Sequence, residues 1–197
     1  MPDLGLINIS DGNSKLGAIP NISLVPGRDC GNCSHCVKDC YAVKFWRIYP
    51  AVRNAWEKNS TAAKDQKSFF RAIERYIKSR RPEYFRFHVA GDIKNQRYLD
   101  NMKLLASRYP QTRFLTFTKM HHLDFRNLPA NLAIVASMWP GLELPEGTVR
   151  QLPKAWMQDG TDSRVPANAI PCPGRCDQCG MCWALPQIGR DVVFHKH

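Results

Sequence analysis

The sequence lacks the long apolar runs of membrane proteins. No stretch of its 197 residues approaches the ~20 consecutive apolar residues that a membrane span needs. Residues 1–10 carry no signal-peptide pattern. Internal repeats, apart from two cysteine clusters, and low-complexity segments are also absent. We therefore expect an ordered, cytoplasmic protein that has no membrane partner.

Four signatures of common enzyme classes are missing as well. The sequence contains no G-x-x-x-x-G-K-[ST], G-x-G-x-x-G, H-E-x-x-H or G-x-S-x-G motif. Their absence removes support for ATP hydrolysis on a phosphate-binding loop, for a Rossmann fingerprint, for zincin proteolysis and for α/β-hydrolase chemistry.

Acidic residues are scarce: 17 Asp and Glu stand against 28 Lys and Arg, for a formal net charge of +11. The excess lies in residues 44–113, which hold 17 basic and 6 acidic side chains, while the rest of the chain is balanced. A basic middle third indicates an anionic partner such as a nucleic acid. Solvated helix faces explain the same pattern.

Apolar patterning predicts alternating strands and helices. Short runs bounded by turn residues predict strands at residues 6–10, 21–25, 84–89, 113–118, 132–137, 154–158 and 191–195. Helical spacing predicts helices at residues 40–59 with a break at Pro50, at 66–78 and at 95–109. Such alternation is typical of parallel βα units. We expect one α/β domain over residues 1–197, a partial or distorted (β/α) barrel whose terminal strands close the sheet.

All eight cysteines lie in two clusters with mirrored spacing. The first, C-x2-C-x2-C-x3-C, comprises Cys30, Cys33, Cys36 and Cys40, and the second comprises Cys172, Cys176, Cys179 and Cys182. In a reducing compartment such clusters favour metal ligation over disulfides. The first spacing is also that of bacterial ferredoxins, which favours two [4Fe-4S] clusters. Zinc remains an alternative, because pairing the clusters would supply Cys-x2-Cys pairs from separated segments.

Other candidate residues follow predicted strands. Chemistry on a barrel of parallel strands gathers at the carboxyl ends of those strands. His88, Asp92 and Lys119 occupy such positions and are candidate catalytic residues. A core histidine, a helix N-cap and a solvated strand end are their structural alternatives. His35, inside the first cluster, is a candidate for hydrogen bonding to a cluster sulfur.

Several motifs resemble the phage-encoded gene product 88 proteins. They are Ser10-Asp-Gly-Asn-Ser-Lys-Leu-Gly17, Pro20-Asn-Ile-Ser-Leu24, Cys36-x3-Cys40-Tyr41-Ala42, Pro50-Ala-Val-Arg53, Phe87-His88-Val-Ala-Gly-Asp92 and Cys182-Trp183. The resemblance implies a phage origin, hence the host cytoplasm, and an iron–sulfur protein related in architecture to radical S-adenosylmethionine (SAM) enzymes. We expect a redox or radical-type enzyme that takes an electron donor and an unknown small-molecule or anionic substrate.

SAM as a cofactor is left open by the cysteine spacing. The radical SAM motif is C-x3-C-x2-C. The segment Cys36-x3-Cys40 lacks a third cysteine, whereas Cys172-x3-Cys176-x2-Cys179 has the spacing near the end of the chain. The second function class is a nucleic-acid-binding protein that zinc or clusters stabilise. In that class the basic residues 44–113 contact phosphate, and the interleaved aromatic side chains stack on bases: Phe45, Trp46, Tyr49 and Trp56.

Overall fold

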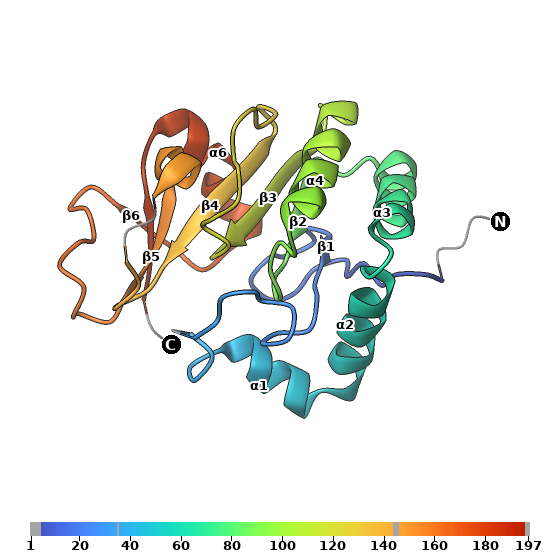
Figure 1. Ribbon diagram of the computed structural model, residues 1–197, viewed down its shortest axis with the longest axis horizontal. Helices are drawn as coiled ribbons and strands as arrows, with labels where there is room; N and C mark the ends of the chain where they lie inside the picture. Colours follow the sequence, from blue (N-terminus) through green and yellow to red (C-terminus); the bar gives the residue numbers. More distant parts are fainter. Residues whose placement is uncertain (1–4, 35, 144–145, 196–197) are drawn as a thin grey trace.

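The computed structural model describes residues 5–34, 36–143 and 146–195. Within them, seven parallel strands form one sheet in the order β1-β2-β3-β4-β5-β7-β6 (Figure 1). The strands are β1 (Asn21–Ile22), β2 (Tyr84–Phe87), β3 (Arg113–Thr118), β4 (Leu132–Met138), β5 (Lys154–Gln158), β6 (Ile170–Pro171) and β7 (Val192–His195). The helices are α1 (Tyr41–Ile48), α2 (Pro50–Ala62), α3 (Gln66–Arg80), α4 (Gln96–Arg108), the 3-10 helix η1 (Gly147–Gln151), α5 (Cys176–Cys179) and α6 (Met181–Ile188).

Local signals in the sequence set the limits of the helices. Pro50 opens α2, because proline fits the first turn of a helix and cannot continue the helix before it. Asp65 caps α3 by accepting hydrogen bonds from two backbone N–H groups of its first turn, and the side chain of Asn95 caps α4. The predicted break at Pro50 and the predicted helices at residues 66–78 and 95–109 are confirmed.

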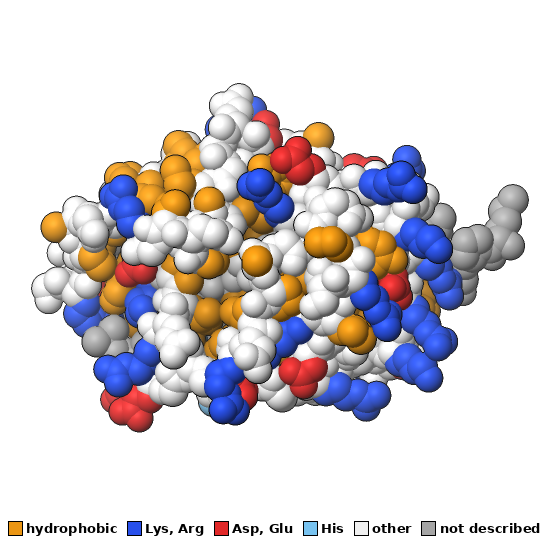
Figure 2. All heavy atoms as spheres, turned by 90° about the horizontal axis from the view of Figure 1, so that it is seen from above, with side chains coloured by type: hydrophobic (Ala, Val, Ile, Leu, Met, Phe, Trp, Pro, Cys, Tyr) orange, Lys and Arg blue, Asp and Glu red, His pale blue; other side chains and the backbone are white. Residues whose placement is uncertain are grey.

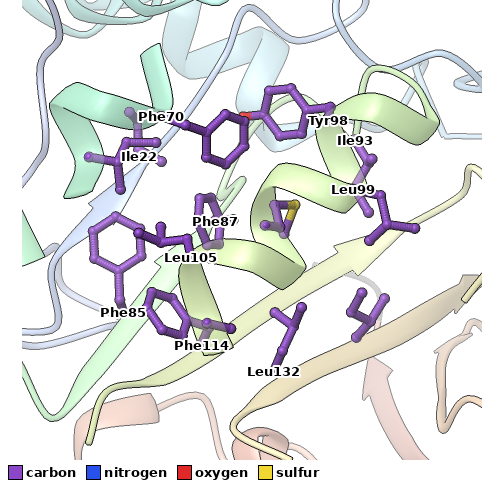
Figure 3. Close-up of a cluster of buried hydrophobic side chains, with 14 of the residues drawn as sticks. Ile22, Phe70, Phe85, Phe87, Ile93, Tyr98, Leu99, Leu105, Phe114 and Leu132 are labelled. Atoms are coloured by element: carbon purple, nitrogen blue, oxygen red, sulfur yellow. The ribbon is translucent and has the colours of Figure 1, made fainter. Parts of the chain in front are cut away.

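The main core lies between the sheet and helices α3 and α4. Figure 3 shows its side chains converging from both layers, among them Phe70, Phe85, Phe87, Tyr98, Leu99, Leu105, Phe114 and Leu132. Phe87 is fully buried, and its ring centroid lies 5.1–6.3 Å from those of Phe70, Phe85 and Phe114. The other face of the sheet packs against α6 through Leu115, Ala133, Val135, Trp183 and Leu185. Helices therefore cover both faces.

The sheet is open, so the expected closure into a barrel is wrong. Its edge strands are β1 and β6. Residues 6–10 form no named strand in the described part of the chain, where Ser10 makes an isolated antiparallel bridge to Asn21. The side chain of Asn59 on α2 accepts a hydrogen bond from the Asn8 N–H (2.6 Å) and donates one to the Asn8 carbonyl (2.8 Å). These backbone groups are thus satisfied without a strand partner.

The predicted strand at residues 191–195 forms as β7, but it lies between β5 and β6 rather than at a closing edge. The sequence pattern does not predict β6, α5 or α6. The two residues of β6 are too few to show alternation, and α6 contains Pro186, which ordinarily marks the end of a helix.

Basic side chains gather at one end of the molecule. Figure 2 shows many Lys and Arg residues at the end of the molecule that carries α3. That helix exposes Lys67, Arg71, Arg75, Lys78 and Arg80. No helix in the described ranges is long and apolar enough to cross a membrane.

Candidate functional site

The first cysteine group lies in the loop between β1 and α1, at the lower edge of the molecule in Figure 1. The Asp92 N–H donates to the Asp29 carbonyl (2.8 Å), and the Lys94 Nζ lies 2.5 Å from the Asp29 carboxylate. Gly31 packs so closely on Met120 that a side chain at Gly31 would collide with the Met120 sulfur. These contacts tie the loop to the segments that follow β2 and β3.

The thiols of the first group lie beside Lys119, which follows β3. Cys36 is buried, and Cys30, Cys33 and Cys40 are half-buried. The charge of Lys119 lowers the pKa of Cys36 and of Cys30, against the larger effect of burial, which raises both. Burial raises the pKa of Cys30 to about 11, although the Gly27 N–H, 3.2 Å from its Sγ, favours the thiolate. A metal that binds this thiol therefore displaces a proton.

The second group begins directly after β6 and runs through α5 into the first turn of α6. The Cys172 N–H extends the β6–β7 pairing by donating to the Val193 carbonyl (2.9 Å), and the Cys176 N–H donates to the Lys15 carbonyl (2.8 Å). The indole N–H of Trp183 donates to the Arg113 carbonyl (3.1 Å). The loop is thereby fixed against one face of the sheet and against the N-terminal segment.

All four thiols of the second group line one cavity of about 20 Å³. Cysteine is a residue type that zinc ions and iron–sulfur clusters take as a ligand. Burial, together with the other three thiols, raises the pKa of Cys182 to about 12, while the charge of Arg86 lowers it. A cavity of this volume holds about one water molecule or ion. It is too small, as it stands, for a four-iron cluster.

Arg86, on β2, faces the second group without a carboxylate partner. Its guanidinium carbon lies 4.9 Å from the centre of the Phe117 ring, and its Nε is buried with no hydrogen-bond partner. Its charge acts on Cys176 and Cys182. Among the described residues, no ion pair includes Arg86. A half-buried cation is costly unless an anion offsets it, and metal-bound thiolates are such an anion.

Tyr41, the first residue of α1, lies between the two groups. Burial of the hydroxyl end raises the pKa of Tyr41, and this hydroxyl donates to a backbone carbonyl just after β2 (2.8 Å). The thiols of Cys40 and Cys176 also raise the pKa of its hydroxyl, and the charges of Arg86 and Lys119 lower it. The residue as a whole is 52% exposed. The fold thus makes neighbours of two cysteine groups that lie far apart in the sequence.

His88 and Asp92, two of the candidate catalytic residues, are buried and fully engaged. The His88 ring nitrogens lie 3.2 Å from the Thr116 hydroxyl and 3.1 Å from the Tyr98 hydroxyl. The Asp92 carboxylate accepts hydrogen bonds from the N–H groups of Ile93 (2.7 Å) and Lys119 (2.8 Å), which joins the ends of β2 and β3. Both residues support the carboxyl edge of the sheet, and a catalytic role for them stays a prediction.

We expect His88 to make the fold acid-sensitive. Burial lowers the pKa of His88 from 6.5 to about 3. The unfolded chain takes up a proton on His88 below about pH 6.5, whereas the folded protein does so only near pH 3. Stability is therefore lost as the pH falls through this window, by about 2 kcal/mol between pH 7 and pH 5.

Urea denaturation of the wild type and of His88→Gln at pH 7 and pH 5 measures this loss. The Gln variant keeps a polar side chain without a titrating group, so its stability should fall by about 2 kcal/mol less over the same interval. Equal losses in both proteins would show that His88 does not carry the effect. Asp92, whose pKa burial raises, is present in both proteins and cancels from the comparison.

The metal ligands predicted from the sequence are not confirmed. Among the described residues, no three His, Cys, Asp or Glu side chains gather in an arrangement that holds a metal ion. His35 lies outside the described residues. The sequence motifs drew attention to Tyr41, which directly follows Cys40, but not to Arg86. For Arg86 the available signal was a charged side chain inside the otherwise aromatic strand Tyr84–Phe87.

The fold and the site define a small α/β protein, an open parallel sheet that carries two four-cysteine loops. The family model of gene product 88 matches residues 7–185, so the chain belongs to the gene product 88 family, the phage gene-product family that its motifs resemble. No curated protein and no solved structure matches the chain. The match shows the family and leaves the relation to radical SAM enzymes a proposal.

Proposed function

We propose that this chain is an iron–sulfur protein that carries one [4Fe-4S] centre at each cysteine group and acts as a redox or radical-type enzyme. The observation that carries the proposal is the pair of half-buried cations, Lys119 and Arg86, each of which faces one group of thiols. A cluster bound by four thiolates is an anion. It would offset each cation and be stabilised in return.

The ligands in this proposal are Cys30, Cys33, Cys36 and Cys40 for the first centre and Cys172, Cys176, Cys179 and Cys182 for the second. Each such cluster supplies one-electron transfer when bound. Gaps of two and three residues allow one loop to surround one centre. The small cavity at the second group favours zinc at that position, and zinc is therefore the second candidate.

The residues of the site other than the cysteines have two roles: they balance the charge of the centres, and they control the access of substrate and water. With such centres bound, the charges of Lys119 and Arg86 would stabilise the added negative charge of the reduced state. The same cations attract an anionic substrate. SAM and an external electron donor are the co-reactants in this proposal. Tyr41, whose hydroxyl lies near thiols of both groups, shields the space between the centres from water.

Anaerobic purification followed by metal and sulfide analysis tests this function. We expect a brown protein with about eight irons and eight acid-labile sulfides per chain. Cys36→Ala and Cys179→Ala should each lose about half of both and remove different electron-paramagnetic signals after reduction. Val37→Ala and Gln178→Ala, exposed positions between the ligands of each loop, are the matched controls and should keep the full content.

Other compositions contradict the proposal. A colourless protein with two zinc ions per chain would establish the zinc alternative, and a protein free of metal would remove both. Added SAM should change the signal that depends on Cys36, because the first loop joins a strand to a helix at the edge where such folds place their chemistry. A change in the Cys179-dependent signal alone would reverse the roles of the two centres.

A further inference from the structure

Exposed apolar side chains concentrate in one short segment. Seven large hydrophobic residues are exposed in the described part of the chain, and five lie between residues 37 and 49: Val37, Tyr41, Phe45, Ile48 and Tyr49. Of α1 itself, Ala42 alone is fully buried. Figure 1 shows α1 at the lower edge of the molecule, outside the layers that cover the sheet. A concentrated apolar patch of this kind marks an interaction site.

Three aromatic rings form a row along this helix. Tyr41, Phe45 and Tyr49 are four residues apart and so lie on one side of the helix. The ring centroids of Tyr41 and Phe45 are 6.4 Å apart, and those of Phe45 and Tyr49 are 5.4 Å apart. Phe45 and Tyr49 are 45% and 49% exposed and are inclined by only 33° to each other. They therefore offer ring surface to flat partners outside the protein.

Positive charge flanks the row. A groove of about 530 Å³ beside α1 is lined by Val37, Lys38, Cys40, Val43, Lys44, Arg47 and Ile48. Three of these residues are basic and none is acidic. Glu57, an acidic residue on the adjoining α2, is paired with Arg28 at 2.8 Å. The segment thus combines exposed aromatic rings with a groove that attracts a polyanion.

We propose that α1, with the groove of Lys38, Lys44 and Arg47, binds single-stranded nucleic acid. Bases stack on Phe45 and Tyr49, and phosphates lie along the basic side chains, the two elements that single-strand binding combines. A two-fold dimer through α1 would place Lys44 and Arg47 against their own copies, which like charge opposes. An acidic helical peptide prefers a mainly apolar groove, whereas three of the seven residues that line this groove are Lys or Arg. The surface extends from Val37 through α1 and includes Cys40 in its groove, and its aromatic and basic side chains are the same whichever metal the cysteines hold.

Fluorescence anisotropy with a labelled oligothymidylate of about 15 nucleotides tests the surface directly. Contact of about three cations with phosphate predicts a log–log salt slope of about −2. Phe45→Ala and Tyr49→Ala should each weaken binding about tenfold, because each removes one stacking surface. The double variant Lys44→Glu, Arg47→Glu should abolish most of the salt dependence. All four positions are exposed, so circular dichroism and thermal unfolding should stay unchanged.

The matched controls remove an apolar side chain or reverse basic charges on helices other than α1. Leu104→Ala removes a 49% exposed apolar side chain from α4, and Arg71→Glu with Lys78→Glu reverses two charges on the exposed face of α3. Neither should alter affinity by more than about twofold. Equal losses in the α3 variant, equal affinity for a duplex of the same length, or equal competition by polyglutamate would overturn the proposal. So would sedimentation that shows a dimer dissociated by Phe45→Ala. Comparing the affinity for an oligouridylate of the same length with that for the oligothymidylate shows whether RNA or DNA is preferred.

Discussion

Replacing Phe87 with alanine is expected to lower the free energy of unfolding by about 3–5 kcal/mol. Phe87 is fully buried on β2, and its ring lies against the rings of Phe70, Phe85 and Phe114, which join α3 to the sheet. The substitution removes the apolar contacts and leaves a cavity that three rigid aromatic neighbours cannot collapse to fill. Urea denaturation followed by circular dichroism measures the loss.

Phe45→Ala is the matched control, because it deletes the same ring from an exposed position on α1. We expect it to change the unfolding free energy by less than about 0.5 kcal/mol. A loss below about 1 kcal/mol for Phe87→Ala would mean that the β2 core repacks, and it would contradict the described arrangement of rings.

Arg86→Met is expected to have opposite effects on the metal-free and the metal-loaded protein. Without metal, the substitution removes a half-buried cation that has no carboxylate partner, and the methionine side chain still covers Phe117. The free energy of unfolding should rise by about 1 kcal/mol. In the loaded protein the same cation balances bound thiolates, so its loss should cost about 1–3 kcal/mol and lower the reduction potential of the second centre.

Urea denaturation of the wild type and of Arg86→Met, with and without a chelator, measures whether the free energy of unfolding rises in the metal-free form and falls in the metal-loaded form. Arg113→Met is the control, because Arg113 is an exposed cation on the neighbouring strand, where it lies over the Tyr84 ring. Its effect should be the same in both forms. If Arg86→Met shifts both forms equally, the charge of Arg86 is unrelated to metal at the cysteine groups.

Local sequence signals predicted those parts of the fold that local interactions determine. The break at Pro50 and the helices capped by Asp65 and Asn95 depend on residues within one helical turn. The buried strand β4 is an almost continuous apolar run, which is typical of a strand that is covered on both faces. The parallel α/β class follows from the alternation of strands with helices.

The failures involve partners that are distant in the sequence. Residues 6–10 read as a strand, but the side chain of Asn59 from α2 satisfies Asn8. The place of β7 inside the sheet depends on pairing with β5 and β6, which no local pattern encodes. In the candidate site, too, local sequence predicts some residues, and others depend on parts of the chain that are distant in the sequence. Spacing identified the cysteines and the neighbouring Tyr41, whereas the effect of Arg86 on Cys182 depends on residues that lie far apart in the sequence.

The position of β7 also sets an order of assembly. Synthesis delivers the first cysteine loop, β1 and β2 well before the C-terminal strand. The second loop, by contrast, leaves β6, whose sheet partner is β7, made later in the chain. Until β7 enters between β5 and β6, Cys172 lacks the Val193 carbonyl that anchors it. The second group therefore takes up its described place in the fold later than the first group.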